Sequence, residues 1–231
     1  MAAKQPGQMT REMHMVHTAF RREFGLVPDL VRSAAAGDRE RAEIIADHFG
    51  TINVALEEHH GGEDRDLWPR LRERCPEEIQ PLVHRMEEQH RRIAQLVLDL
   101  TTTLAVWRTD GNAESRDHAL NTLDQFLPVL REHLGDEEEH VLPLIEKHIT
   151  GDEWDTMVAT SAAGTPPDKI SLFFGIMMYE GDPAAVEDAL RNMPGEVRAL
   201  IVEAAPRAYA EYATRLYGTP TPPLGSTLPS R

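Results

Sequence analysis

The chain has 231 residues, an ordinary hydrophobic fraction of 41% and a formal net charge of −15 at pH 7. A chain this acidic lacks the basic surface that nucleic acids and anionic membranes require, so we expect neither as a partner. The single cysteine excludes an internal disulfide, and no segment has the roughly 20 consecutive apolar residues of a membrane-spanning helix. The N-terminus is polar rather than apolar, so we expect a cytoplasmic protein.

The first half of the chain predicts two long helices. Apolar residues recur at helical spacing over residues 10–24, and a short helical segment follows at 29–36. Asp38 is a suitable N-cap for the second long helix. One stripe of that helix carries apolar side chains together with His59 and Glu63, which places both residues on its inward face.

The second half predicts two more long helices. The third begins near Pro76 and carries His90, and the fourth carries His133 and Glu137. Pro128 lies within the fourth helix and is a place where that helix can be interrupted. Four long helices with short connections predict an all-α fold built on an antiparallel four-helix bundle.

Further helices are expected beyond the bundle, at 152–163, 170–179, from residue 182 onward and at 194–217. We therefore assign residues 10–150 to a four-helix bundle and residues 151–217 to a C-terminal helical extension that packs on it. The last segment, 218–231, repeats proline and threonine, and we expect it to be a disordered tail.

A histidine–glutamate pattern occurs twice in the chain. His59 is followed four residues later by Glu63 and ten residues later by a proline, and His133 is followed in the same way by Glu137 and a proline. Residues four apart on a helix share a face. Each pair can therefore present one imidazole and one carboxylate to the same centre.

A lone histidine precedes each pattern at a matched distance. His17 precedes His59 by 42 residues, and His90 precedes His133 by 43. Buried carboxylates are costly without cations, so four histidines and two glutamates in matched sets predict a two-metal site. Imidazole and carboxylate ligands suit iron or manganese, and the lack of thiolates argues against structural zinc. His14, one turn from His17, is the alternative ligand on the first helix; we favour His17.

The other histidines near these patterns are less suited to bind metal. His48 lies three turns before His59, which is too far to reach the same ion, so we expect a polar role in the core or outside the ligand shell. His60 is expected to face sideways from His59. His140 lies two turns beyond His133 and is expected to lie outside the ligand shell.

These motifs resemble the hemerythrin-like (HHE cation-binding) family over roughly residues 10 to 148. The matching segments are His17-x-x-Phe20-Arg21, His59-His60-x-x-Glu63-Asp64, Glu88-Gln89-His90 and His133-x-x-x-Glu137-Glu138. The segment Phe174–Pro183 also resembles a bacterial subgroup of these proteins. The resemblance implies a bundle that encloses two non-haem iron ions per chain, bridged by oxo or hydroxo groups.

The resemblance implies six metal ligands in this chain. His17 and His59 would bind one iron and His90 and His133 the other, with two bridging carboxylates, Glu63 and Glu137. The oxygen-carrying members have a His-x-x-x-His pair on the third helix, whereas Met86 and Ala94 stand four residues before and after His90 here. Without that fifth histidine, each iron would keep an open position.

The resemblance also implies a function. An open di-iron pair can bind and react with O2, peroxide or nitric oxide, which corresponds to an oxidoreductase active against oxidative or nitrosative stress. One alternative is a sensor in which the apolar, methionine-rich segment 170–179 reports the state of the site. Another is an oxidase of a small organic substrate, with Tyr179 in the wall of its pocket. The sequence leaves open the oxidant, the electron donor and the oligomeric state.

Overall fold

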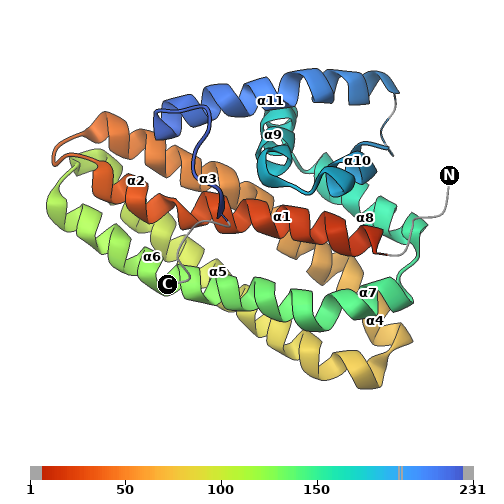
Figure 1. The fold of residues 1–231 in the computed structure, drawn as a ribbon. Coiled ribbons are helices and arrows are strands. Elements are labelled where there is room, and N and C mark those ends of the chain that lie inside the picture. Colours follow the sequence, from red (N-terminus) through yellow and green to blue (C-terminus); the bar gives the residue numbers. More distant parts are fainter. Residues whose placement is uncertain (1–6, 192, 194, 226–231) are drawn as a thin grey trace.

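Four long helices form an elongated bundle in the computed structural model (Figure 1). They are α1 (Gln8–Gly25), α3 (Arg39–Gly62), α5 (Pro76–Asp110) and α6 (Ala113–Asp136). The structure describes residues 7–191, 193 and 195–225, and within these ranges the chain is helical and contains no strand. The expected all-α fold is confirmed. None of the described helices is both long and apolar enough to cross a membrane.

The connections between the bundle helices are short and well capped. The Asp38 side chain accepts a hydrogen bond from the backbone N–H of Arg41, as expected for the N-cap of α3. Gly111 ends α5 in the left-handed conformation with φ 65°, and Asn112 caps α6. α6 continues without a break through Pro128, the residue at which the sequence allowed an interruption. The flanking side chains of α6 are buried in the core, and this packing offsets the backbone hydrogen bond that proline removes.

Shorter helices extend the bundle at both ends. α2 (Val27–Ser33) follows α1 at one end. At the other end α3 and α6 pass through π-helical turns, η1 (Glu63–Leu67) and η2 (Glu137–Val141), into α4 (Trp68–Arg74) and α7 (Leu142–His148).

The bundle core consists of two hydrophobic clusters separated by a polar layer. On α5, the residues of the first cluster lie between Ile93 and Trp107, and those of the second between Ile79 and Met86. His90 falls between the two clusters. The predicted ligands therefore occupy a layer with apolar packing on both sides, which restricts the access of water.

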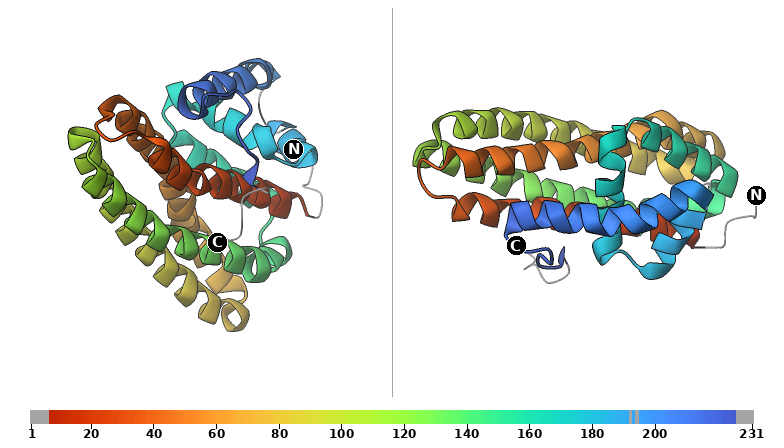
Figure 2. Two further views of the ribbon diagram at one scale, coloured as in Figure 1. Left: turned by 60° about the vertical axis from the view of Figure 1, so that its left-hand side comes forward. Right: turned by 90° about the horizontal axis from the view of Figure 1, so that it is seen from above.

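The C-terminal extension covers α1 and α3 (Figure 2). α8 (Gly151–Ala163) packs on α3, while α9 (Ile170–Glu180) and α10 (Pro183–Arg191) pack on α1. α11 (Gly195–Tyr217) lies along α9 and also contacts α3. A short 3-10 turn, η3 (Pro167–Lys169), joins α8 to α9.

A buried polar network joins this extension to α1. The Glu23 carboxylate accepts hydrogen bonds from Arg22 Nε at 2.8 Å, the Tyr209 hydroxyl at 2.8 Å and the Tyr217 hydroxyl at 2.7 Å. Arg22 Nη2 donates to the carbonyl of Ile176 in α9 at 2.6 Å. The Arg22 and Glu23 side chains are both fully buried, so these hydrogen bonds offset the cost of removing two charges from water.

Residues 218–225 run back along the extension. The Tyr179 hydroxyl donates to the Pro222 carbonyl at 2.7 Å, and the Gly225 N–H donates to Glu180 Oε2 at 2.8 Å. Pro222 is buried. We expected disorder from residue 218, but these contacts give residues 218–225 a defined conformation. The rest of the expected disordered tail, 226–231, lies outside the described residues.

Candidate metal centre

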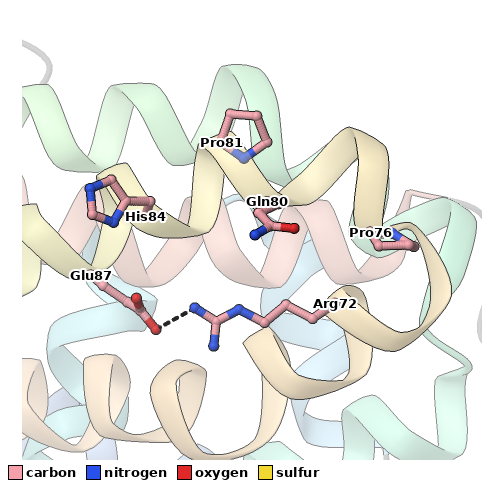
Figure 3. A pocket seen from close by; sticks show the side chains of 6 residues that line it. All are labelled: Arg72, Pro76, Gln80, Pro81, His84 and Glu87. Atoms are coloured by element: carbon pink, nitrogen blue, oxygen red, sulfur yellow. Dashed lines mark hydrogen bonds and ion pairs between the residues drawn. The ribbon is translucent and has the colours of Figure 1, made fainter.

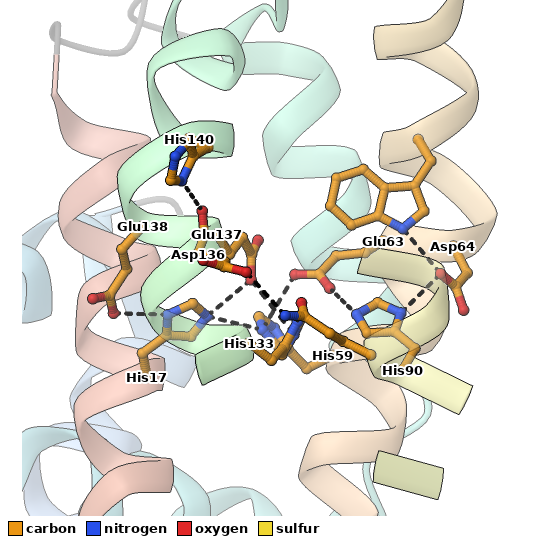
Figure 4. A network of polar contacts seen from close by, with 12 residues as sticks. His17, His59, Glu63, Asp64, His90, His133, Asp136, Glu137, Glu138 and His140 are labelled. Carbon is orange, nitrogen blue, oxygen red and sulfur yellow. Dashed lines mark hydrogen bonds and ion pairs between the residues drawn. The ribbon is translucent and has the colours of Figure 1, made fainter. Parts of the chain in front are cut away.

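The structure brings the six predicted ligands together in the middle of the bundle (Figure 4). Each of the four long helices supplies a histidine, and the two π-helical turns supply the glutamates. The residues are His17, His59, Glu63, His90, His133 and Glu137. All are buried except His59, whose side chain is 13% exposed.

The carboxylate of Glu63 faces both halves of the cluster. Its Oε1 atom lies 3.2 Å from Nε2 of His59, and its Oε2 atom lies 3.3 Å from Nε2 of His90. Because the two oxygens point to histidines of different halves, this carboxylate can bridge two ions.

Glu137 occupies the equivalent place in the second half. Its Oε2 atom lies 3.4 Å from Nε2 of His17 and 3.9 Å from Nε2 of His133. His17 Nε2 is in turn 3.2 Å from His59 Nε2. The two halves of the cluster therefore share both carboxylates.

Each glutamate is the first residue of a π-helical turn. The backbone N–H of Trp68 donates to the carbonyl of Glu63, five residues earlier, and the N–H of Leu142 does the same to Glu137. Pro69 and Pro143, the prolines of the repeated pattern, follow directly and have no N–H to continue an α-helical ladder. The pattern thus marks a local widening of the helix at the carboxylate, a distortion that is frequent at functional sites.

The two halves also exchange supporting carboxylates. Asp64, which follows Glu63, places Oδ1 2.9 Å from Nδ1 of His90 in the second half. Glu138, which follows Glu137, places Oε1 2.9 Å from Nδ1 of His17 in the first half. A carboxylate on Nδ1 fixes the ring and directs Nε2 toward the centre.

Further hydrogen bonds hold the carboxylates of Asp64 and Glu138 in place. Trp68 Nε1 donates to Asp64 Oδ1 at 2.9 Å, and Arg21 donates to both oxygens of Glu138 at 2.6 and 2.9 Å. We did not assign roles to Asp64 and Glu138 from the sequence. The sequence does contain a feature that points to these supporting carboxylates, because an acidic residue follows the glutamate in both copies of the pattern.

The structure distinguishes His17 from His14. The His17 side chain is fully buried within the cluster, whereas the His14 side chain is 48% exposed and lies 3.3 Å from Glu138. His140 binds the carbonyl of Asp136 through Nδ1 and lies outside the cluster, as expected.

His60 lies in the cluster, and our expectation that it faces sideways is wrong. Its ring stacks on His90 with a centroid distance of 4.1 Å and meets His133 edge-on at 4.8 Å. One ligand nitrogen from each of these three histidines lies within 4.8 Å of the other two. Adjacent residues on a helix are about 100° apart. Because α3 contacts both α1 and α5, two neighbouring faces of α3 point into the bundle.

The cluster contains buried polar atoms that have no hydrogen-bond partner among the described residues. They are Nε2 of His60, His90 and His133 and both carboxylate oxygens of Glu63 and Glu137. A buried polar atom without a partner is costly, and these atoms converge on one place. Nitrogen and carboxylate donors suit iron or manganese, so the residues fit a metal centre.

The electrostatics of the cluster also suit a site that holds positive charge. Burial and the neighbouring Glu137 raise the pKa of Glu63 to about 8. Burial lowers the pKa of His17, but hydrogen bonds to carboxylates outweigh it and raise the value to about 9. The same balance raises the pKa of His90 to about 10. Without metal, protons therefore offset the buried carboxylates, and a metal ion must displace them.

Comparisons with known proteins agree with this arrangement. The chain matches the hemerythrin HHE cation binding domain over residues 8–145. It is also similar to an uncharacterized hemerythrin-like protein of Schizosaccharomyces pombe, at 24% identity over 98 residues, which cover 42% of this chain and 44% of that protein. No solved structure matches the chain. The matched region spans the bundle and all six predicted ligands, and the chain belongs to the hemerythrin HHE cation-binding family.

Proposed function

We propose that the chain holds a non-haem di-iron centre. One iron is bound by His17 and His59, the other by His90 and His133, and both are bridged by Glu63 and Glu137. The observation that carries this proposal is the placement of Glu63, whose oxygens face His59 on one side and His90 on the other at 3.2 and 3.3 Å. The unpartnered nitrogen and oxygen atoms around it support the same assignment.

His60 is a seventh ligand in this proposal. Its unpartnered Nε2 lies close to ligand nitrogens of His90 and His133, so three imidazoles would hold the second iron and two the first. The chain lacks the second histidine on its third long helix, and His60 supplies the fifth imidazole from α3 instead. The ion held by His17 and His59 would then have fewer protein ligands and would be the one that binds the small oxidant.

The centre binds and reacts with a small oxidant, which is O2, hydrogen peroxide or nitric oxide. Two ferrous ions held by these residues would supply the two electrons that, with two protons, convert one hydrogen peroxide molecule to two water molecules. Asp64 and Glu138 hold the rings of His90 and His17 in place through hydrogen bonds. Apolar side chains limit the access of water to the centre. One of them is Phe20, whose ring centroid lies 5.4 Å from that of His59.

A sensor function is the second candidate, because one helix joins the centre to the extension. α1 carries His17 in the cluster and, five residues later, Arg22, which donates to the Ile176 carbonyl of α9. A shift of α1 on metal binding would therefore reach the extension. Limited proteolysis after Gly164 tests this candidate, since a sensor changes its cleavage rate with metal or oxidant.

The oxidase alternative has less support. A groove in the bundle surface reaches His60 and His90. It is lined by residues of α3, η1 and α5 rather than by residues 170–217. Tyr179 uses its hydroxyl to bind the Pro222 carbonyl and packs against Tyr209.

The experiment that tests the proposed function mixes anaerobic ferrous protein with one equivalent of hydrogen peroxide. We expect rapid loss of peroxide together with new absorption bands of a bridged diferric centre. His48→Ala, which changes a buried histidine outside the cluster, is the control and should react as the wild type does. Unchanged absorption and persistent peroxide in a protein with two irons would favour the sensor.

A further inference from the structure

A groove between α3 and α5 leads to the metal centre. It has a volume of about 560 Å³, and its lining includes the rings of His60 and His90, which are 8% and 6% exposed. The Nε2 atom of each has no hydrogen-bond partner among the described residues. Of the other ligands, His17, His133 and Glu137 are completely buried, and His59, which is 13% exposed, does not line this groove, so an ion in the groove meets His60 and His90 first.

The α3 side of this groove is acidic. Glu57 is exposed at the rim, and the Asp64 side chain is 49% exposed. Glu87 also lines the groove, but its ion pair with Arg72 at 2.7 Å offsets its charge (Figure 3). Arg91 is the cation on the α5 side. Among the described residues, neither Glu57 on α3 nor Asp64 on η1 is paired with a guanidinium, and these two carboxylates flank the path, where they attract cations.

Asp64 connects the rim to the buried imidazoles. Its carboxylate is half-exposed, yet Oδ1 lies 2.9 Å from Nδ1 of His90 (Figure 4). An ion that moves along the groove therefore meets carboxylate oxygens first and imidazole nitrogens next. Both ligand types suit a divalent transition metal that exchanges water for protein ligands stepwise.

We propose that divalent metal ions reach the centre through the groove between α3 and α5. Glu57 and Asp64 attract the hydrated ion, and His60 is the first imidazole to bind it. The inference rests on the proposed function, since it needs a centre to fill, but it concerns the rate of filling rather than the number of ions bound.

The first test blocks the groove. Ala94 is exposed and lines the groove on α5, so Ala94→Phe places a ring over the path without changing a buried side chain. Ala105→Phe, at an exposed position of the same helix outside the groove, is the matched control. Chelator-treated full-length protein is mixed with Co²⁺, and the cobalt absorption bands are followed by stopped flow. We expect Ala94→Phe to load at least about threefold more slowly, because the ring must first move aside, and Ala105→Phe to load as the wild type does.

The second test reverses the charge at the rim and does not depend on how the phenylalanine packs. Glu57→Lys should lower the association rate constant about tenfold at low salt and weaken its dependence on ionic strength. Glu203→Lys, at an exposed position of α11, has the same effect on net charge and serves as the control.

The final cobalt content should be two per chain in all four variants. A wild-type rate constant in Glu57→Lys, or in an Ala94→Phe protein that still binds two ions, would overturn this inference and leave the di-metal centre intact. Failure of the wild-type chain to bind cobalt would instead count against the proposed function.

Discussion

The carboxylate of Asp64 lies 2.9 Å from Nδ1 of His90, although the two residues come from different halves of the repeated sequence. Glu138 and His17 repeat the relationship at the same distance. Each half of the chain therefore orients the lone histidine of the other half. The two helix pairs depend on each other for the geometry of the centre as well as for its ligands.

Asp64→Asn is expected to weaken metal binding without abolishing it. The amide keeps the shape of the side chain but loses the charge that fixes the His90 ring, and loss of such a partner lowers metal affinity about 10- to 100-fold. Competition with a chromophoric chelator measures the change. Asp66→Asn, two residues further on and bound among the described residues to Arg65 of η1 and Arg70 of α4, should retain wild-type affinity.

Glu63→Ala is expected to reduce the bound metal below two per chain and to lower the melting temperature of the metal-supplemented protein. The substitution removes the carboxylate that faces both halves, and metal bound only by the folded state stabilises that state. Metal analysis and thermal denaturation with and without chelator measure both effects. Wild-type metal content in this variant would refute the assignment of Glu63 as a bridge.

His60→Phe tests the seventh ligand. Phenylalanine retains a ring that can stack on His90 but has no nitrogen, so we expect one of the two ions to bind more weakly while the fold is kept. Titration of chelator-treated protein with Co²⁺ should separate a tight and a weakened step. His48→Ala provides the contrast and should bind both ions as the wild type does.

His48 gives the stability of the chain a dependence on pH. Burial lowers its pKa below the ordinary value of 6.5, and the charge of Arg22 adds to this effect, which outweighs the opposing influence of Glu23. A histidine held neutral contributes its full stability above pH 6.5 and loses it as the pH falls further. The urea-unfolding free energy of the wild type should therefore fall more than that of His48→Gln between pH 7.5 and 5.5. Parallel curves for the two proteins would show that His48 is not held neutral.

Tyr209→Phe is expected to loosen the extension and leave the metal centre intact. The hydroxyl donates to the fully buried Glu23 carboxylate, and a hydrogen bond to a charged group contributes about 1.5–3 kcal/mol. Urea unfolding measures this loss. Tyr179→Phe, whose hydroxyl donates to the uncharged Pro222 carbonyl, should cost less, at about 0.5–1.5 kcal/mol. An equal loss in the two variants would contradict a special role for Glu23.

Much of the fold could be predicted from the sequence, because helix length and caps are local properties. The spacing of apolar residues and the Asp38 cap defined the bundle helices. We could expect His17, His59, His90 and His133 to lie close together because the sequence repeats their spacing. The two histidines are 42 residues apart in the first half and 43 in the second.

The parts that could not be predicted depend on contacts between distant segments. His60 is adjacent to His59, and only the position of α5 shows that its face is also inward. The buried network at Glu23 joins residues more than 180 positions apart. Nothing in the local sequence around Tyr209 indicates that its hydroxyl meets a carboxylate of α1.

The most direct test of the central claim is the metal content of the full chain purified from iron-supplemented cells, together with its absorption spectrum. We expect two irons per chain and the charge-transfer bands of a bridged diferric pair, both lost in Glu63→Ala. Protein without iron, or with a single zinc ion, would contradict this claim.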